Sequence, residues 1–154
     1  MKTIQAGTQA PDFELPDDNG GLLKLSDRLA SGPVVLFFYP TALSGGCTAE
    51  VCHFRDLAQE FAEAGAQPIG ISTDAVPTQR RFAATTGIAF PLVSDRSGDV
   101  ARAYGVKRKY VTPVKRATFV IDTAGVIREV IASEWSMDVH ADKALAALRA
   151  LASR

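Results

Sequence analysis

The chain has 154 residues, of which 47% are hydrophobic, and its 17 basic residues balance 17 acidic ones. This length suits a single domain, residues 1–154, with one hydrophobic core. With no net charge, the composition does not indicate a basic surface for nucleic acid or an anionic membrane. The first residues lack the apolar core of a signal peptide, and no segment approaches the roughly 18 apolar residues of a membrane span. We therefore expect a cytoplasmic protein that binds neither nucleic acid nor membrane.

The first predicted elements are a hairpin and a parallel strand–helix–strand unit. Apolar stretches within 13–25 flank an Asn-Gly turn signal, which predicts a small N-terminal hairpin. The run "VVLFFY" at 34–39 is typical of a central strand that is buried on both faces. An amphipathic helix is predicted from 47 to about 64, and a second buried strand at 67–73 completes a right-handed crossover.

The remaining elements complete an α/β pattern. Three short elements come next: a helix at 78–86, a strand at 91–94 and a helical turn at 97–104. The segments 117–122 and 126–132 flank "TAG", which predicts an antiparallel hairpin with Gly125 in the left-handed conformation. A last helix is predicted from Asp138, its expected N-cap. This order matches a thioredoxin-like fold, a three-layer sandwich with a central mixed sheet flanked by helices and an added N-terminal hairpin.

The two cysteines of the chain lie close together in the segment "PTALSGGCTAEVC". Cys47 falls in the first turn of the predicted helix, where backbone N–H groups are unpaired and the helix dipole is positive. On a helical wheel Cys47 shares the core-facing stripe of Val51 and Phe54, whereas Cys52 lies about 140° away. Helix geometry separates the two cysteine Cα atoms by roughly 8.7 Å, beyond the roughly 7 Å that a disulfide allows. A disulfide between them therefore requires the start of the helix to unwind.

The cysteine pair has two other interpretations. Both residues could be small hydrophobic side chains of an ordinary helix, since free cysteine is often buried. A zinc site is disfavoured, because Cys47, Cys52 and His53 splay around one helix and only His140 is left as a fourth ligand. We expect neither a metal nor a cofactor.

A reactive cysteine at this position needs a nearby cation. A free thiol has a pKa of about 8.5, so only about 3% of it is ionised at pH 7. The helix dipole contributes roughly 0.3–1 kcal/mol, less than one pKa unit. Arg116, directly before an apolar run, is the best candidate, although it could also end a strand in solvent; Arg55 points about 80° away. Ser44 could offer its hydroxyl to a reacting oxygen or cap the helix, and Pro40 could simply end a strand.

The segment around Cys47 resembles the peroxiredoxins, and within them the subfamily called peroxiredoxin Q or bacterioferritin comigratory protein. The signature P-x-x-x-T/S-x-x-C is matched by Pro40, Ser44 and Cys47, and "SGGCTAEVCHFRD" is similar to the subfamily's TPGCTxExxxFRD. Gly45 stands where that subfamily commonly has proline. Similar stretches, such as "GTQAPDFELPDDNG", "GISTD" and "RATFVID", extend the likeness over nearly the whole chain.

The resemblance implies a role for each of six residues. They are Cys47 as peroxidatic cysteine, Cys52 as resolving cysteine, Arg116 as stabiliser of the thiolate, Ser44 as the group that orients the peroxide, Pro40 as its shield from water, and Glu50 as the brace of the arginine.

The implied enzyme is an atypical 2-Cys peroxidase that reduces hydrogen peroxide and organic hydroperoxides. Its Cys47 sulfenic acid would be resolved by Cys52 as an intramolecular disulfide, and thioredoxin or glutaredoxin would reduce that bond. We expect a monomer or weak homodimer. A general thiol-disulfide oxidoreductase and a redox sensor or holdase without significant peroxidase turnover are the alternatives.

Overall fold

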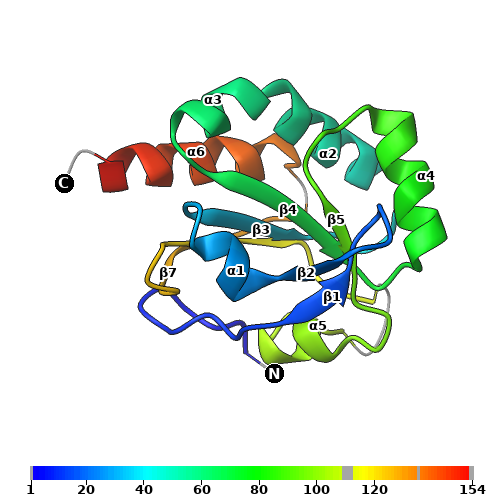
Figure 1. The fold of residues 1–154 in the computed structure, drawn as a ribbon, viewed down its shortest axis with the longest axis horizontal. Helices are drawn as coiled ribbons and strands as arrows, with labels where there is room; N and C mark the ends of the chain where they lie inside the picture. The colour runs from blue at the N-terminus through cyan, green and yellow to red at the C-terminus, as the bar shows by residue number, and fades with distance from the viewer. Residues whose placement is uncertain (1, 109–112, 135, 153–154) are drawn as a thin grey trace.

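The computed structural model describes residues 2–108, 113–134 and 136–152. Its central sheet has five strands in the order β5-β4-β3-β6-β7. The strands are β3 (Val34–Phe38), β4 (Gln67–Ser72), β5 (Leu92–Ser94), β6 (Ala117–Ile121) and β7 (Ile127–Ala132). β3, β4 and β5 run parallel, whereas β6 is antiparallel to both β3 and β7. The predicted mixed sheet is confirmed, with the apolar run of β3 at its centre (Figure 1).

Both faces of the sheet are covered, so the molecule has three layers (Figure 1). One face carries α2 (Gly45–Asp56), α3 (Ala58–Glu63), α4 (Val76–Thr86) and α6 (Asp138–Ala152). The other face carries α1 (Leu25–Leu29), α5 (Asp99–Ala103) and the N-terminal hairpin. This arrangement confirms the predicted three-layer sandwich.

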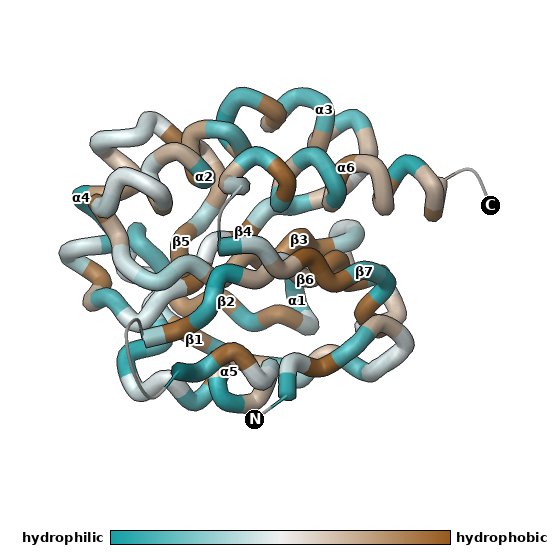
Figure 2. The backbone as a smooth tube through the Cα atoms, turned by 180° about the vertical axis from the view of Figure 1, so that it is seen from behind, coloured by the Kyte–Doolittle hydropathy of each residue, from teal (hydrophilic) through white to brown (hydrophobic). Residues whose placement is uncertain are grey.

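Alternate side chains of β3 belong to two separate hydrophobic clusters. Val34, Leu36 and Phe38 pack on the side of α1 and α5, whereas Val35 and Phe37 pack on the side of α2, α4 and α6. The single core expected from the chain length is therefore divided in two by the sheet. Because both faces are covered, the strand is apolar throughout instead of alternating. Figure 2 shows the same feature as hydrophobic stretches along β3 and β6 inside more polar helices.

The N-terminal hairpin forms as predicted and makes a small sheet of its own. Its strands are β1 (Glu14–Pro16) and β2 (Leu22–Lys24), which pair antiparallel. Gly20 adopts a φ of +88°, the left-handed conformation that the turn requires. The Asp17 carboxylate accepts the backbone N–H groups of Asn19 and Gly21, which closes the turn.

The helix predicted at 47–64 is divided into α2 and α3. The chain leaves helical geometry at Leu57, where φ is −98° and ψ is 13°, and its new direction keeps the stacked rings of Phe54 and Phe61 buried. α2 also begins earlier than predicted, at Gly45, because the Ser44 side chain caps it. α4 likewise starts before residue 78, since Pro77 fits a first helical turn.

The last helix, α6, packs one face on the sheet. Ala141, Ala144 and Leu148 are buried, as the core-facing stripe of an amphipathic helix requires. Asp138 is the first residue of α6 and not its N-cap. In the first turn its negative charge still interacts favourably with the helix dipole. Among the residues that the structure describes, no helix is long and apolar enough to cross a membrane.

Candidate active site

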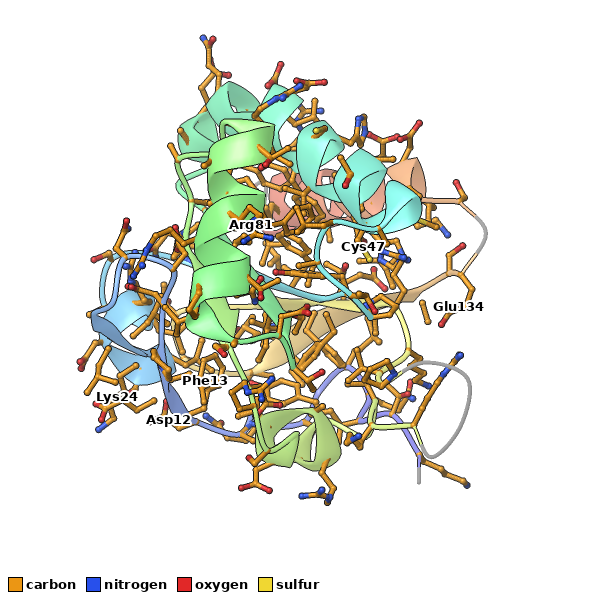
Figure 3. All side chains as sticks on the ribbon, turned by 90° about the vertical axis from the view of Figure 1, so that its right-hand side faces the viewer. Asp12, Phe13, Lys24, Cys47, Arg81 and Glu134 are labelled. Atoms are coloured by element: carbon orange, nitrogen blue, oxygen red, sulfur yellow. The ribbon has the colours of Figure 1, made fainter. Side chains whose placement is uncertain are left out.

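Cys47 lies in the first turn of α2 with its side chain directed into the protein. Its exposed fraction is 1%, and Figure 3 shows it at the base of α2, on the same side of the molecule as Glu134. The Ser44 hydroxyl accepts the Cys47 N–H at 3.4 Å and donates to the Thr41 carbonyl at 2.9 Å. Ser44 is thus a helix cap, one of the two roles that the local sequence allowed. Cys52 is half-buried further along α2, and both thiols are free.

Arg116 reaches Cys47 from the opposite side of the site. Its Nη2 donates to the Cys47 sulfur at 3.3 Å. Arg116 directly precedes β6, and β6 pairs with β3, whose end leads into the loop before Cys47. The guanidinium is buried, which excludes the alternative of a strand end in solvent. The sheet therefore brings together a cation and a sulfur that lie 69 residues apart in the chain.

Glu50 lies one helical turn after Cys47 and pairs with the same arginine. Its Oε1 accepts a hydrogen bond from Arg116 Nη1 at 2.7 Å, and its side chain is wholly buried. Burial raises the pKa of Glu50 to about 8, although the attraction of Arg116 opposes this shift. Burial by itself would lower the pKa of Arg116, but the attraction of Glu50 and Cys47 outweighs it and raises that pKa. The arginine thus stays charged between its two partners.

The loop between β3 and α2 is held at its middle by Asp74. The Ala42 N–H donates to Asp74 Oδ2 at 2.8 Å, and the Ser72 hydroxyl donates to the same oxygen. Leu43 has a φ of +67°, an uncommon conformation for a residue other than glycine. Pro40, at the start of this loop, is buried. The segment that presents Cys47 therefore depends on a carboxylate that the sequence did not single out.

Arg55 does not share the Cys47 site. Its Nη1 donates to the Thr86 carbonyl at 2.7 Å, and its other nitrogens bond to Asp56. The wheel-based expectation that Arg55 points away from Cys47 is confirmed.

Comparison with known proteins places the chain in a family. The family described as AhpC/TSA matches residues 6–130. The chain belongs to the AhpC/TSA family. A relative from Mycobacterium tuberculosis named as a peroxiredoxin is 56% identical over 97% of this chain and 99% of its own length. A chloroplast peroxiredoxin Q from Populus jackii is 34% identical over 96% of this chain and 70% of its own.

Solved structures of this family share the fold. A crystal structure of a peroxidoxin from Mycobacterium tuberculosis superposes with a TM-score of 0.93 at 56% identity, over 96% of this chain and 98% of that one. The bacterioferritin comigratory protein of Xanthomonas campestris gives a TM-score of 0.86 at 32% identity, over 98% of this chain and 99% of that one. The resemblance to peroxiredoxin Q and the thioredoxin-like fold are both confirmed. The chain is a peroxiredoxin, and thus a thiol peroxidase.

Two residues beside Arg116 and Glu50 were not among the six to which the resemblance gave a role. Glu134, in the loop after β7, accepts the backbone N–H of Arg116 at 3.0 Å and a hydrogen bond from Arg108 at 2.8 Å. His140 is wholly buried on α6 and lies 3.6 Å from Glu50. A buried histidine amid the alanines of an apolar helix face is the signal that could have drawn attention to it.

The histidines weighed as zinc ligands have other partners. His53 Nε2 lies 2.8 Å from Asp142, and His140 Nδ1 lies 2.8 Å from the Thr118 hydroxyl. In the described ranges, no three His, Cys, Asp or Glu side chains are grouped so that they could hold a metal ion.

Proposed function

We propose that this peroxiredoxin reduces hydrogen peroxide and organic hydroperoxides through attack by the Cys47 thiolate. The observation that carries the proposal is the contact of 3.3 Å between Arg116 Nη2 and the Cys47 sulfur in a buried site. A neutral thiol needs no cationic partner. A thiolate, in contrast, is stabilised by a fixed cation and by the N-terminus of α2.

The chemical step transfers one oxygen atom to sulfur. The thiolate attacks the terminal oxygen of ROOH, the O–O bond breaks, and RO⁻ leaves and takes up a proton to become ROH. Sulfur is oxidised to the sulfenic acid and the peroxide is reduced. Arg116 and the first N–H groups of α2 are placed to stabilise the charge that develops on the two oxygens.

Ser44 is suited to orient the peroxide as an acceptor. Its hydroxyl hydrogen points to the Thr41 carbonyl, and one lone pair takes the Cys47 N–H. A hydroxyl has a second lone pair, which is left for the O–H of a bound hydroperoxide. Pro40 has no N–H to bind water in this loop, in keeping with a shielding role, and Glu50 braces Arg116.

Resolution by Cys52 requires α2 to open at its N-terminal end. Cys47 and Cys52 lie in one continuous helix, in which residues five apart are too distant for a disulfide. Gly45 and Gly46 weaken the first turn, since glycine disfavours a helix. Near the other end of α2, the ring of Phe54 stacks on that of Phe37 with a centroid distance of 4.2 Å, which anchors this end of the helix. Opening of the first turns, with the C-terminal half held in place, is the motion that fits these contacts.

The proposed partners are a protein reductant and hydroperoxide substrates. A dithiol protein such as thioredoxin or glutaredoxin would reduce the Cys47–Cys52 disulfide by exchange. Organic hydroperoxides are included because the Xanthomonas relative is described in terms of its alkyl peroxide reduction activity. A monomer or weak homodimer in the cytoplasm remains our expectation for the enzyme as a whole.

A coupled assay with thioredoxin, its reductase and several hydroperoxides tests this function. We expect reductant consumption that depends on peroxide and disappears in Cys47→Ser. Peroxide consumption by Cys47→Ser at the wild-type rate would contradict the assignment. Insulin reduction without peroxide would instead support the general oxidoreductase, and client binding that rises on oxidation without turnover would support the sensor.

A further inference from the structure

One oxygen of Glu50 lacks a hydrogen-bond partner although it is buried. Oε1 is bonded to Arg116, but within the described part of the chain Oε2 has no donor. His140 Nδ1 lies 3.6 Å from this oxygen, and both side chains are wholly buried. An unsatisfied buried acceptor costs about 1–3 kcal/mol, and more when it is charged. The cost is removed if a proton lies between these two atoms.

The contacts of His140 define where its own protons lie. Nε2 is 2.9 Å from the Ser133 carbonyl, which can only accept, so Nε2 carries a hydrogen. In a neutral ring Nδ1 is then an acceptor. The Thr118 hydroxyl, 2.8 Å from Nδ1, can donate or accept and so suits either state of the ring. Without a further proton, an ionised Glu50 Oε2 would face a second acceptor.

We propose that Glu50 and His140 share one proton between Oε2 and Nδ1 while Cys47 is a thiolate, and that the pair loses this proton when Cys47 is oxidised. A shift of about 0.5 Å brings the two atoms within hydrogen-bond range. His140 is thereby a positioning residue, acting on Cys47 through Glu50 and Arg116. This inference rests on the proposed role of Cys47.

The charges of the buried cluster explain why the proton is held in only one state. With a thiolate at Cys47, the charges of Cys47, Arg116 and an ionised Glu50 sum to −1, and one shared proton brings the cluster to zero. Once the sulfur is a neutral sulfenic acid, Arg116 and an ionised Glu50 already balance. A net charge is costly in a buried site, so the proton is favoured in the first state and disfavoured in the second.

The surroundings of His140 support a proton that lies mainly on the carboxyl. The groups that face the ring are Glu50 from α2, Arg116 and Thr118 at β6, and Glu134 after β7. Burial lowers the pKa of His140, and the charge of Arg116 acts in the same direction, whereas Ser133 and Glu134 oppose them. Burial also raises the pKa of Glu50 to about 8. A neutral carboxyl beside a neutral imidazole satisfies both tendencies, and the single lone pair of Nδ1 is then shared by the hydroxyl hydrogens of Glu50 and Thr118.

The proton balance of the peroxidase step is then closed within the enzyme. A thiolate, ROOH and one proton give a sulfenic acid and ROH, so each oxidation consumes one proton. The proton that leaves Glu50 and His140 matches the one that RO⁻ takes up. Near neutral pH, the oxidation of Cys47 therefore takes up no net proton from solution.

Carbon-13 NMR of glutamate side-chain carboxyls tests the shared proton, with Glu50→Gln to assign the signal. In the reduced enzyme we expect the Glu50 carboxyl to titrate near the pKa of about 8. In Cys47→Ser, which keeps the helix but lacks the thiolate, we expect the midpoint to fall by about one pH unit or more. The same midpoint in both proteins, or a Glu50 carboxyl ionised throughout the neutral range in the reduced enzyme, would overturn the proposal.

A kinetic comparison of the two histidines supplies an independent test. We expect His140→Gln to lose about tenfold in the rate constant of Cys47 oxidation at neutral pH and to change its pH profile. His53→Gln, which alters a histidine bonded to Asp142, should keep both. A folded His140→Gln protein with the wild-type pH profile would overturn the proposal. Peroxidase turnover by Cys47→Ser would overturn the proposed function itself, whereas an inactive Cys47→Ser with an unchanged Glu50 titration overturns only the shared proton.

Discussion

Arg116 and Cys47 are 69 residues apart in the chain, yet Arg116 Nη2 lies 3.3 Å from the Cys47 sulfur. The same guanidinium donates to Glu50 through Nη1. A planar group with several fixed donors can hold both partners at once, whereas a lysine ammonium is a single point charge.

The first prediction concerns this double contact. We expect Arg116→Lys to lower the rate constant of Cys47 oxidation by about 10²-fold, since loss of one stabilising donor in a buried site has an effect of that order. Rapid-mixing measurement of sulfenic acid formation checks this result. Arg55→Lys is the matched control, because Arg55 bonds to Thr86 and Asp56. Equal rates for Arg116→Lys and wild type would contradict a role for the fork geometry.

The second prediction separates oxidation from resolution. We expect Cys52→Ser to form one sulfenic acid per chain at the wild-type rate and then to stop in the thioredoxin-coupled assay. The reason is that, in the proposed mechanism, only Cys47 reacts with peroxide, while the disulfide needs both sulfurs. Single-turnover kinetics and mass spectrometry of the product measure the two steps. Sustained thioredoxin-coupled turnover in Cys52→Ser would show that Cys52 is dispensable.

The third prediction uses the glycine pair at the start of α2. A Cβ at Gly45 meets no atom within 4 Å, so Gly45→Ala only stabilises the helix, by about 0.5–1 kcal/mol. We expect disulfide formation to slow about two- to fivefold while oxidation of Cys47 is unchanged.

Gly46→Ala is the contrasting variant. Its Cβ would lie in van der Waals contact with Arg116 Nη2 at 3.4 Å and Met137 Sδ at 3.5 Å, so a change in the rate of oxidation would report on the arginine. Stopped-flow fluorescence can follow both phases. If Gly45→Ala resolves as fast as wild type, unwinding of the first turn does not limit disulfide formation.

The fourth prediction concerns the loop before α2. Asp74→Ala removes the acceptor of the Ala42 N–H and of the Ser72 hydroxyl. We expect a loss of about 1–2 kcal/mol in the free energy of unfolding and a slower oxidation of Cys47, because the loop is no longer held. Denaturant unfolding and peroxide kinetics measure the two effects. Asp142→Ala, which removes a surface partner of His53, should leave the oxidation rate unchanged.

The fifth prediction concerns pH and stability. The folded-state pKa of Glu50 is raised from 4.5 to about 8, so the folded protein binds more protons than the unfolded chain between these values. This contribution to stability is complete below pH 4.5 and is lost as pH rises through about 8. The lowered pKa of His140 acts with the opposite sign, raising stability as pH increases towards 6.5.

Glu50→Gln isolates the carboxyl contribution. We expect its free energy of unfolding to fall less steeply than that of wild type between pH 4.5 and about 8. Urea unfolding at several pH values measures the slope. Parallel pH curves for the two proteins would mean that Glu50 is ionised in the folded state.

Much of the fold could be predicted from local patterns. The run of β3 is apolar at every position because both faces are covered, and this pattern is visible without a structure. The hairpin turn at Gly20 and the turn at Gly125 were predicted because each needs a positive φ that glycine adopts readily. Helix ends were less accurate: α2 begins at Gly45 because of the Ser44 cap, and it ends at Asp56 because Leu57 leaves helical geometry.

The sequence by itself, with its resemblance to the peroxiredoxins, indicated the candidate reactive group and its chemical class. The spacing of Pro40, Ser44 and Cys47 and the five-residue gap to Cys52 are local features, and helix geometry turns them into a thiol at a helix start whose partner is out of reach. Only the tertiary structure decided which groups surround that thiol. Arg116 reaches it through strand pairing, and His140 faces Glu50 through the packing of α6 on the sheet. Electrostatic interactions in a buried site depend on distances between segments remote in the chain, and no local pattern encodes these distances.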